Sequence, residues 1–238
     1  MMRSMIKTTV ACAALLAAAH PAWAEADLEG VWKIATPTPA LLTDQGTLPP
    51  LTKAGLEIYN QNQAAIAKGD RRSWDPVAKC KPPGEPRTYT EMNWPFELFQ
   101  SKDRIDFLFQ WNRLDRAIPI MDKQIDDPDE PFYFGQSVAQ WDGNVLKVEV
   151  ENIKPNTFLD DAGLPHSDDL TIDETWRLRD PDTLVGTFHF VDPTIYSSPW
   201  DATLVFKRQP AGTRVLEDSC TDRTNSNDYA TIDNSLVK

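Results

Sequence analysis

The sequence is poor in the residues and motifs on which many enzyme classes depend. It has three cysteines and three histidines in 238 residues. It contains no CxxC pair, phosphate-binding loop, dinucleotide-binding glycine fingerprint or Ser-His-Asp order, so thiol-redox, kinase, dehydrogenase and hydrolase functions find no support. Its cysteines lie far apart without nearby histidines, which makes a poor zinc site. We therefore expect neither a cofactor nor a bound metal.

Positive charge is also scarce. The chain has 24 lysines and arginines against 36 acidic residues, for a formal net charge of −12. An acidic chain without a basic run repels the phosphate backbone of nucleic acids. We therefore expect no nucleic-acid partner.

Long apolar runs are missing after the N-terminus. Arg3 and Lys7 precede the apolar run 8–19, and small residues at 22–24 fit signal-peptidase cleavage, so residues 1–24 resemble a secretory signal. The run is too short for a permanent membrane anchor. We expect residues 25–238 to form a single periplasmic or secreted domain that is not stably inserted in a membrane.

Two cysteines, Cys80 and Cys220, remain after cleavage of that signal. In an oxidising compartment a disulfide is their natural pairing. Two buried free thiols are the alternative.

Alternating apolar and polar residues dominate the domain and predict strands. Leu146, Val148 and Val150, for example, alternate with charged residues after a turn at 142–144. Further strands are expected in LEGVWKI, in two segments of 171–192, and at 95–101, 104–111, 116–121, 137–141, 200–209 and 213–220.

A single helix is predicted for Leu51 to Lys68, with Thr52 as N-cap and Gly69 as C-cap. Residues 70–94 are rich in proline and charge and are expected to form an ordered loop held by Cys80. Many short strands in hairpin order with one N-terminal helix indicate an all-β fold, an antiparallel up-and-down barrel of the calycin or lipocalin type. The interior of such a barrel can hold side chains or one small ligand, and we expect a hollow interior that admits a ligand.

Glu174 shares a strand face with Ile172 and Trp176, which places a carboxylate on the apolar side. A buried carboxylate needs a partner, such as an arginine, a histidine or a ligand. A solvated position at the barrel mouth is the alternative.

The loop after the strand at 146–151 contains one histidine, His166, among carboxylates (Asp160, Asp161, Asp168 and Asp169). A histidine next to a carboxylate can transfer protons near neutral pH, which predicts His166 as the proton shuttle and Asp161 as its orienting partner. A polar loop whose histidine caps a turn is an equal alternative. The acidic oxygens could instead bind calcium, although their spacing matches no EF-hand loop.

Aromatic residues in proline-rich loops are candidates for the lining of a pocket mouth: Tyr133, Tyr196 and Trp200. They could equally cover the end of the barrel. Arg87 and Arg116 could bind a ligand carboxylate, or they could be structural if they pair with Asp or Glu. Strand aromatics are assigned to the core: Phe96, Phe99, Phe107, Phe109 and Trp111.

The motifs LTKAGLEIYN, CKPPGEPR, PFELFQSKDRI, GQSVAQWDGNVLKVEV, FLDDAGLPHSDDL and DPTIYSSPW, in this order, resemble a widespread family of exported bacterial β-barrel proteins. The resemblance implies a calycin-like barrel but no settled activity. Members often have histidine at the position of Gln136, glutamate at that of Gln110 and arginine at that of Arg116. A role that needs the first two side chains would not carry over to this chain.

These patterns lead to two hypotheses. The first is an enzyme of the isomerase, lyase or hydratase kind that acts on a small apolar or aromatic substrate. It would use His166, Asp161 and Glu174 for acid–base chemistry, with Arg116, Tyr133, Tyr196 and Trp200 around the substrate. The alternative is a periplasmic lipocalin-like carrier without chemistry. A structural protein of the cell envelope, with a barrel packed solid with aromatics, is a third possibility.

Overall fold

The computed structural model describes residues 25–90, 93–121 and 130–224. The expected signal segment 1–24 lies outside these residues. The strands are β1 (Gly30–Ile34), β2 (Phe96–Gln100), β3 (Arg104–Phe109), β4 (Asp115–Pro119), β5 (Gln136–Asp142), β6 (Val145–Glu151), β7 (Thr171–Asp180), β8 (Thr183–Val191) and β9 (Trp200–Arg208). The helices are α1 (Lys53–Ala67), α2 (Arg71–Trp74) and α3 (Cys220–Thr224), with short 3₁₀ turns η1 (Val77–Lys79), η2 (Arg87–Tyr89) and η4 (Trp111–Arg113).

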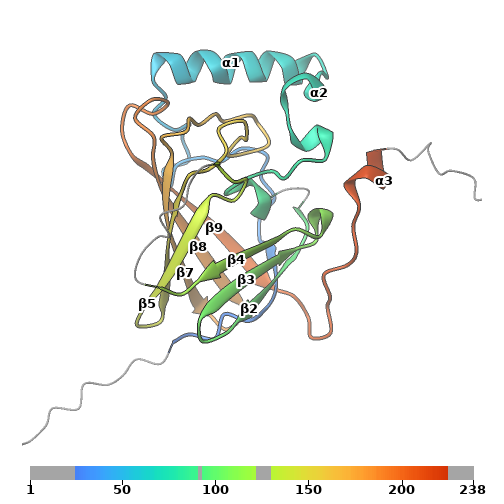
Figure 1. Ribbon diagram of the computed structural model, residues 1–238, viewed down its shortest axis with the longest axis vertical. Coiled ribbons are helices and arrows are strands. Elements are labelled where there is room, and N and C mark those ends of the chain that lie inside the picture. The colour runs from blue at the N-terminus through green and yellow to red at the C-terminus, as the bar shows by residue number, and fades with distance from the viewer. Residues whose placement is uncertain (1–24, 91–92, 122–129, 225–238) are drawn as a thin grey trace, which may run out of the picture.

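All nine strands belong to one antiparallel sheet in the order β4-β3-β2-β1-β9-β8-β7-β6-β5. The sheet curls until its two edge strands, β4 and β5, meet (Figure 1). The prediction of an all-β, up-and-down antiparallel barrel with an N-terminal helix is confirmed. Because nine strands alternate in direction, the two edge strands β4 and β5 run parallel to each other. Within the described residues, the chain just after β4 pairs with β5 through one isolated parallel bridge, Ile120 to Ala139.

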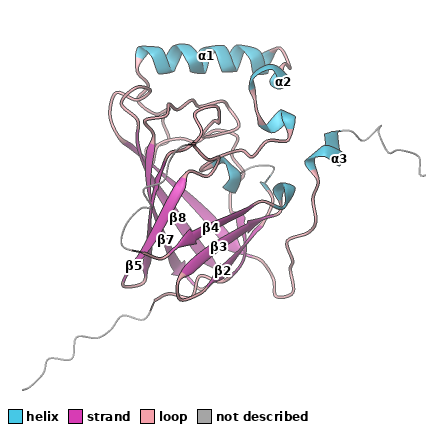
Figure 2. Cartoon of the chain, in the orientation of Figure 1, coloured by secondary structure: helices cyan, strands magenta, loops and turns pink. Residues whose placement is uncertain are grey.

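Helix α1 lies across one end of the barrel, above a layer of loops (Figure 2). Thr52 caps it as predicted, because its side chain accepts a hydrogen bond from the Gly55 N–H. On its lower side, Asn62 donates to the carbonyl of Gly163 at 2.8 Å. The helix therefore fixes the loop that carries His166.

The barrel interior is filled, which corrects the expectation of a hollow for a ligand. Residues 83–89, which we call the plug, are all buried, and η2 carries Tyr89 to the middle of the barrel. The Tyr89 ring contacts aromatic rings from β2, β3, β7, β8 and β9: Phe96, Phe107, Phe109, Trp176, Phe188 and Phe206. The plug belongs to the segment that the sequence predicts as an ordered loop, and its proline and charge content gives no sign of burial.

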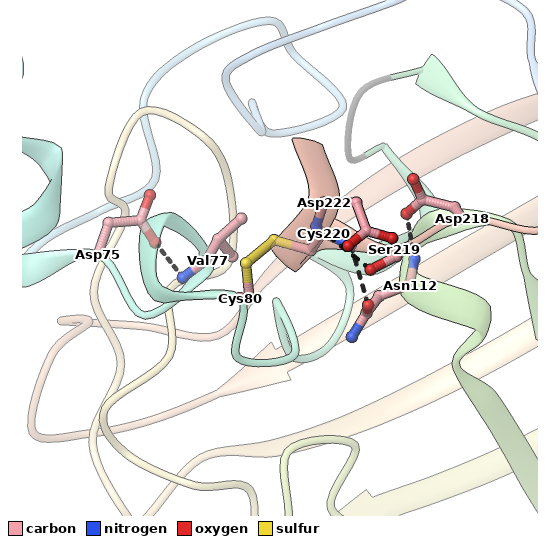
Figure 3. Close-up of a disulfide and its surroundings, with 8 residues drawn as sticks. All are labelled: Asp75, Val77, Cys80, Asn112, Asp218, Ser219, Cys220 and Asp222. Carbon is pink, nitrogen blue, oxygen red and sulfur yellow. Dashed lines mark hydrogen bonds between the residues drawn. A yellow bond between two sulfur atoms is a disulfide. The ribbon is translucent and has the colours of Figure 1, made fainter. Parts of the chain in front are cut away.

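The disulfide between Cys80 and Cys220 is formed, as predicted, with a sequence separation of 140 and a Cα–Cα distance of 5.5 Å. It joins the chain just before the plug to α3 (Figure 3). Beside it, the Cys220 N–H donates a hydrogen bond to the Asn112 side chain. The Asn112 N–H in turn donates one to the Asp218 side chain. A disulfide of this kind indicates an oxidising compartment.

Two predicted details are wrong. Residues 213–220 are not a strand, because the chain runs outside the barrel toward the disulfide after β9. Phe99 is not core: its side chain lies on the outer face of β2 and is 42 % exposed. The other aromatics assigned to the core are buried. Among the described residues, no helix is long and apolar enough to cross a membrane.

Candidate functional site

The seam between β4 and β5 is the place where the barrel wall lacks a continuous backbone ladder. One residue of β4, Arg116, points inward at this seam and is 3 % exposed. Its Nη2 donates to the Ser137 hydroxyl of β5 at 2.9 Å. A side-chain hydrogen bond thus holds the two edge strands together.

Behind the seam, Arg116 is the centre of a buried polar cluster. Its Nη2 lies 2.9 Å from Glu174 Oε1, and its Nη1 lies 3.1 Å from Glu174 Oε2. Nη1 also donates to the Tyr89 hydroxyl at 2.7 Å. Glu174 accepts a further hydrogen bond from the Trp176 indole at 2.8 Å. The expectation of a buried Glu174 with an arginine partner is therefore met, and the alternative of a solvated position is not.

Glu85 is the second carboxyl of the cluster, and sequence reasoning missed it. It belongs to the plug, is fully buried, and lies 3.4 Å from Arg116 Nη1. Neither of its oxygens has a hydrogen-bond partner within the described residues. Burial raises the pKa of Glu85 to about 8, against the lowering effect of Arg116, and Glu174 adds to the rise. Near neutral pH the Glu85 carboxyl is therefore largely protonated.

Directly outside this cluster, a cavity of about 320 Å³ opens at the seam. Its apolar wall comes from the segment before β5, where Phe132 is half-exposed and Tyr133 and Phe134 are partly buried. Polar groups come from both edge strands. The lining residues are Pro82, Asp115, Arg116, Ala117, Phe132, Tyr133, Phe134, Gly135 and Ser137.

Two of the predicted ligand-binding residues, Arg116 and Tyr133, line this same cavity. The Tyr133 ring is held by Lys154, whose ammonium lies 5.2 Å from the ring centroid. Ser137, Phe132 and Phe134 were not identified from the sequence as lining a site. No local pattern distinguishes them from ordinary strand and loop residues.

His166 lies elsewhere, in the loop layer beneath α1, and does not line the cavity. Its Nδ1 is 2.8 Å from the Ser167 carbonyl oxygen, which can only accept, so Nδ1 carries a proton. Its Nε2 is 2.8 Å from the Thr157 hydroxyl. Burial lowers the pKa of His166, so the ring is neutral. Both ring nitrogens are thus used in holding the loop.

The predicted pairing of Asp161 with His166 is wrong. Asp161 instead accepts hydrogen bonds from Arg87 at 2.6 Å and Arg71 at 3.0 Å, and these guanidinium groups help to lower its pKa below the usual value. Arg87 also forms a bidentate pair with buried Asp75 at 3.0 and 2.9 Å. This network ties the plug to the acidic loop, which is a structural role.

The other acidic residues of the loop do not converge on a calcium site. Asp160 accepts hydrogen bonds from the N–H groups of Leu41 and Leu164, both at 2.8 Å. Asp169 accepts one from the Thr194 hydroxyl. Within the described residues, no three His, Cys, Asp or Glu side chains are grouped so that they could hold a metal ion.

Tyr196 and Trp200 cover the barrel end, which is the alternative that the sequence left open. The Tyr196 hydroxyl donates to the Pro165 carbonyl at 2.7 Å, and the Trp200 ring stacks on Phe190 with centroids 4.1 Å apart. Both residues are buried and neither lines the cavity at the seam.

No protein-family model and no curated protein matches the chain. Among solved structures, the chain is similar to a "secretary abundant heat soluble (SAHS) protein" from Ramazzottius varieornatus, with 12 % sequence identity and a TM-score of 0.36. The match covers 79 % of this chain and 99 % of that chain. Two variants of the fluorescent protein UnaG are similar at 12 % and 11 % identity, with 77 % and 76 % of this chain and 96 % and 95 % of theirs covered, both with a TM-score of 0.34. Likenesses at this level say nothing of function, which must be argued from the site itself.

Proposed function

We propose that the protein is an exported carrier that binds a small, largely apolar or aromatic molecule without catalysis. The observation that carries this proposal is the cavity at the seam, whose lining combines aromatic residues with Arg116 and Ser137, which we call its floor. Apolar walls with a few fixed polar groups are typical of small-molecule sites, and about 320 Å³ is at the small end of their range. The disulfide and the signal-like N-terminus support a periplasmic or secreted location.

The isomerase or lyase hypothesis finds less support. It needs His166 and Glu174 within reach of one substrate atom. Glu174 is engaged by Arg116 and Trp176, whereas His166 is engaged in the loop layer by Thr157 and Ser167. Neither residue lines the cavity.

A thermal-shift screen of small neutral aromatics and terpenoids, followed by calorimetry of the hits, tests the proposal. The informative variant is Ala117→Phe, because Ala117 is exposed on β4 and a larger ring there fills the cavity without entering the core. We expect wild type to bind with micromolar affinity and Ala117→Phe to lose at least tenfold.

The matched control is Ala67→Phe, the same change at an exposed position of α1 outside the cavity, which should bind like wild type. An absence of binding in the whole panel would contradict the proposal, as would equal affinity of Ala117→Phe and wild type.

A further inference from the structure

The charges around the cavity floor balance without a ligand. The buried cluster holds one guanidinium, Arg116, and two carboxyl groups, Glu174 and Glu85. Both Glu174 oxygens lie near the guanidinium, Oε2 as a hydrogen-bond acceptor and Oε1 at ion-pair distance, and Glu174 is the acid that neutralises it. With Glu85 protonated, as its raised pKa implies near neutral pH, the cluster carries no net charge.

Hydrogen-bonding capacity remains at the floor even though the charge is balanced. Arg116 Nε–H is buried and has no hydrogen-bond partner within the described residues. Ser137 accepts from Arg116, so its own hydroxyl proton is left for another acceptor. Both residues line the cavity. Of these two donors, the Ser137 hydroxyl is available to a ligand in the cavity, whereas Arg116 Nε–H is inaccessible to solvent and costs free energy until it is paired.

The same surroundings disfavour charged ligands. A ligand carboxylate at the floor would bring a second negative charge to a guanidinium that Glu174 already neutralises, with Asp115 also lining the cavity. A ligand ammonium would bring a second cation against Arg116 and has no lone pair for its donors. A neutral oxygen acceptor meets neither obstacle.

On the basis of the proposed function, we propose that the cavity selects apolar molecules whose polar group is a neutral hydrogen-bond acceptor, such as the carbonyl of a ketone, ester or lactone, and rejects carboxylates and amines. The acceptor oxygen accepts from the Ser137 hydroxyl, next to the Arg116 guanidinium. The apolar body of the ligand lies against Phe132 and Phe134.

A matched series of three probes tests the selection: 2-acetylnaphthalene, 2-naphthoate and 2-naphthylmethylammonium, titrated into the full mature chain at pH 7 and low salt. The three share a ring system and differ in the charge of one group. We expect the ketone to bind at least tenfold more tightly than either ion. Equal or tighter binding of the carboxylate or the ammonium would overturn this inference while leaving a ligand-binding cavity in place. If no probe binds, the inference fails, and the broader screen of the proposed function decides whether that function fails with it.

The variant Glu174→Gln shows whether the cavity rejects the carboxylate because of its charge or because of its shape. The variant keeps the size of the side chain and removes the negative charge beside Arg116, so the ratio of naphthoate affinity to ketone affinity should rise at least tenfold. The control Glu57→Gln removes the same charge on the outer side of α1, and its ratio should equal that of wild type. If Glu174→Gln does not fold, Asp115→Asn at the exposed rim should move the ratio in the same direction by about threefold. An unchanged ratio in the folded variant would overturn the selection by charge.

Discussion

Arg116 of β4 and Glu174 of β7 meet inside the barrel, with Nη2 and Oε1 2.9 Å apart and both side chains almost completely buried. The pair joins the edge strand β4 to β7, which lies two places in from the other edge strand, β5. Together with the Arg116 to Ser137 hydrogen bond, it connects both sides of the seam to β7. The cavity floor and the closure of the barrel therefore depend on the same guanidinium.

The first prediction concerns the stability of this pair. Glu174→Ala removes the carboxylate that pairs with the almost completely buried Arg116 guanidinium. Removal of one partner of a buried pair costs about 3–5 kcal/mol of unfolding free energy, because the other charge stays buried. Urea denaturation of Glu174→Ala and wild type at pH 7 measures this loss of unfolding free energy. Lys147→Ala breaks the exposed pair with Asp142 and should leave the denaturation midpoint unchanged. Equal midpoints for Glu174→Ala and wild type would contradict the arrangement.

The second prediction concerns pH and Glu85. The folded chain holds the Glu85 proton up to a pKa of about 8, whereas an ordinary glutamate loses it near 4.5. Between these values the folded state binds more protons than the unfolded state, so this residue makes stability fall as pH rises. Relative to Glu85→Gln, the unfolding free energy of wild type should fall by up to about 1.4 kcal/mol per pH unit.

Urea denaturation of wild type, Glu85→Gln and Glu57→Gln at pH 5, 6, 7 and 8 measures this slope. Glu57 is exposed on α1, so its variant should follow wild type. Parallel stability curves for wild type and Glu85→Gln would show that Glu85 ionises normally in the folded chain.

The third prediction concerns the disulfide. The Cys80 to Cys220 bond closes a long loop and fixes the chain next to the plug. Its replacement by two alanines should cost about 2–5 kcal/mol, chiefly because the unfolded chain regains freedom. Denaturation of wild type with and without reductant should show the same loss. The unfolding free energy of the double variant should be the same with and without reductant. A change would mean that the reductant acts on the protein other than through this disulfide.

The fourth prediction concerns His166. Because its ring nitrogens serve the loop layer and the residue does not line the cavity, His166→Ala should bind the ligands of the screen within twofold of wild type affinity. Its midpoint of thermal unfolding should nevertheless fall, because the Ser167 carbonyl and the Thr157 hydroxyl lose a buried partner. A large loss of affinity without a loss of stability would bring His166 back into the site.

The sequence alone determined the barrel, the helix and the disulfide. Each has a local or compositional signal: period-two alternation in the strands, Thr52 at the start of α1 and two cysteines in an exported chain. Glu174 could be recognised as buried because its strand neighbours are apolar. Its need for a cationic partner followed from the cost of burying a charge.

Tertiary structure decided the identity of that partner and the place of the site. Glu174 and Arg116 are 58 positions apart, and Glu85 and Tyr89 reach the cluster only because the plug enters the barrel. His166 and Asp161 are five positions apart yet bond to different groups, since α1 and the plug fix their loop from two sides. Strand periodicity reports which face a residue takes, but not which distant segment fills the space opposite. That depends on packing across the whole barrel, and so only the folded chain determined that the interior is filled and that the cavity lies at the seam.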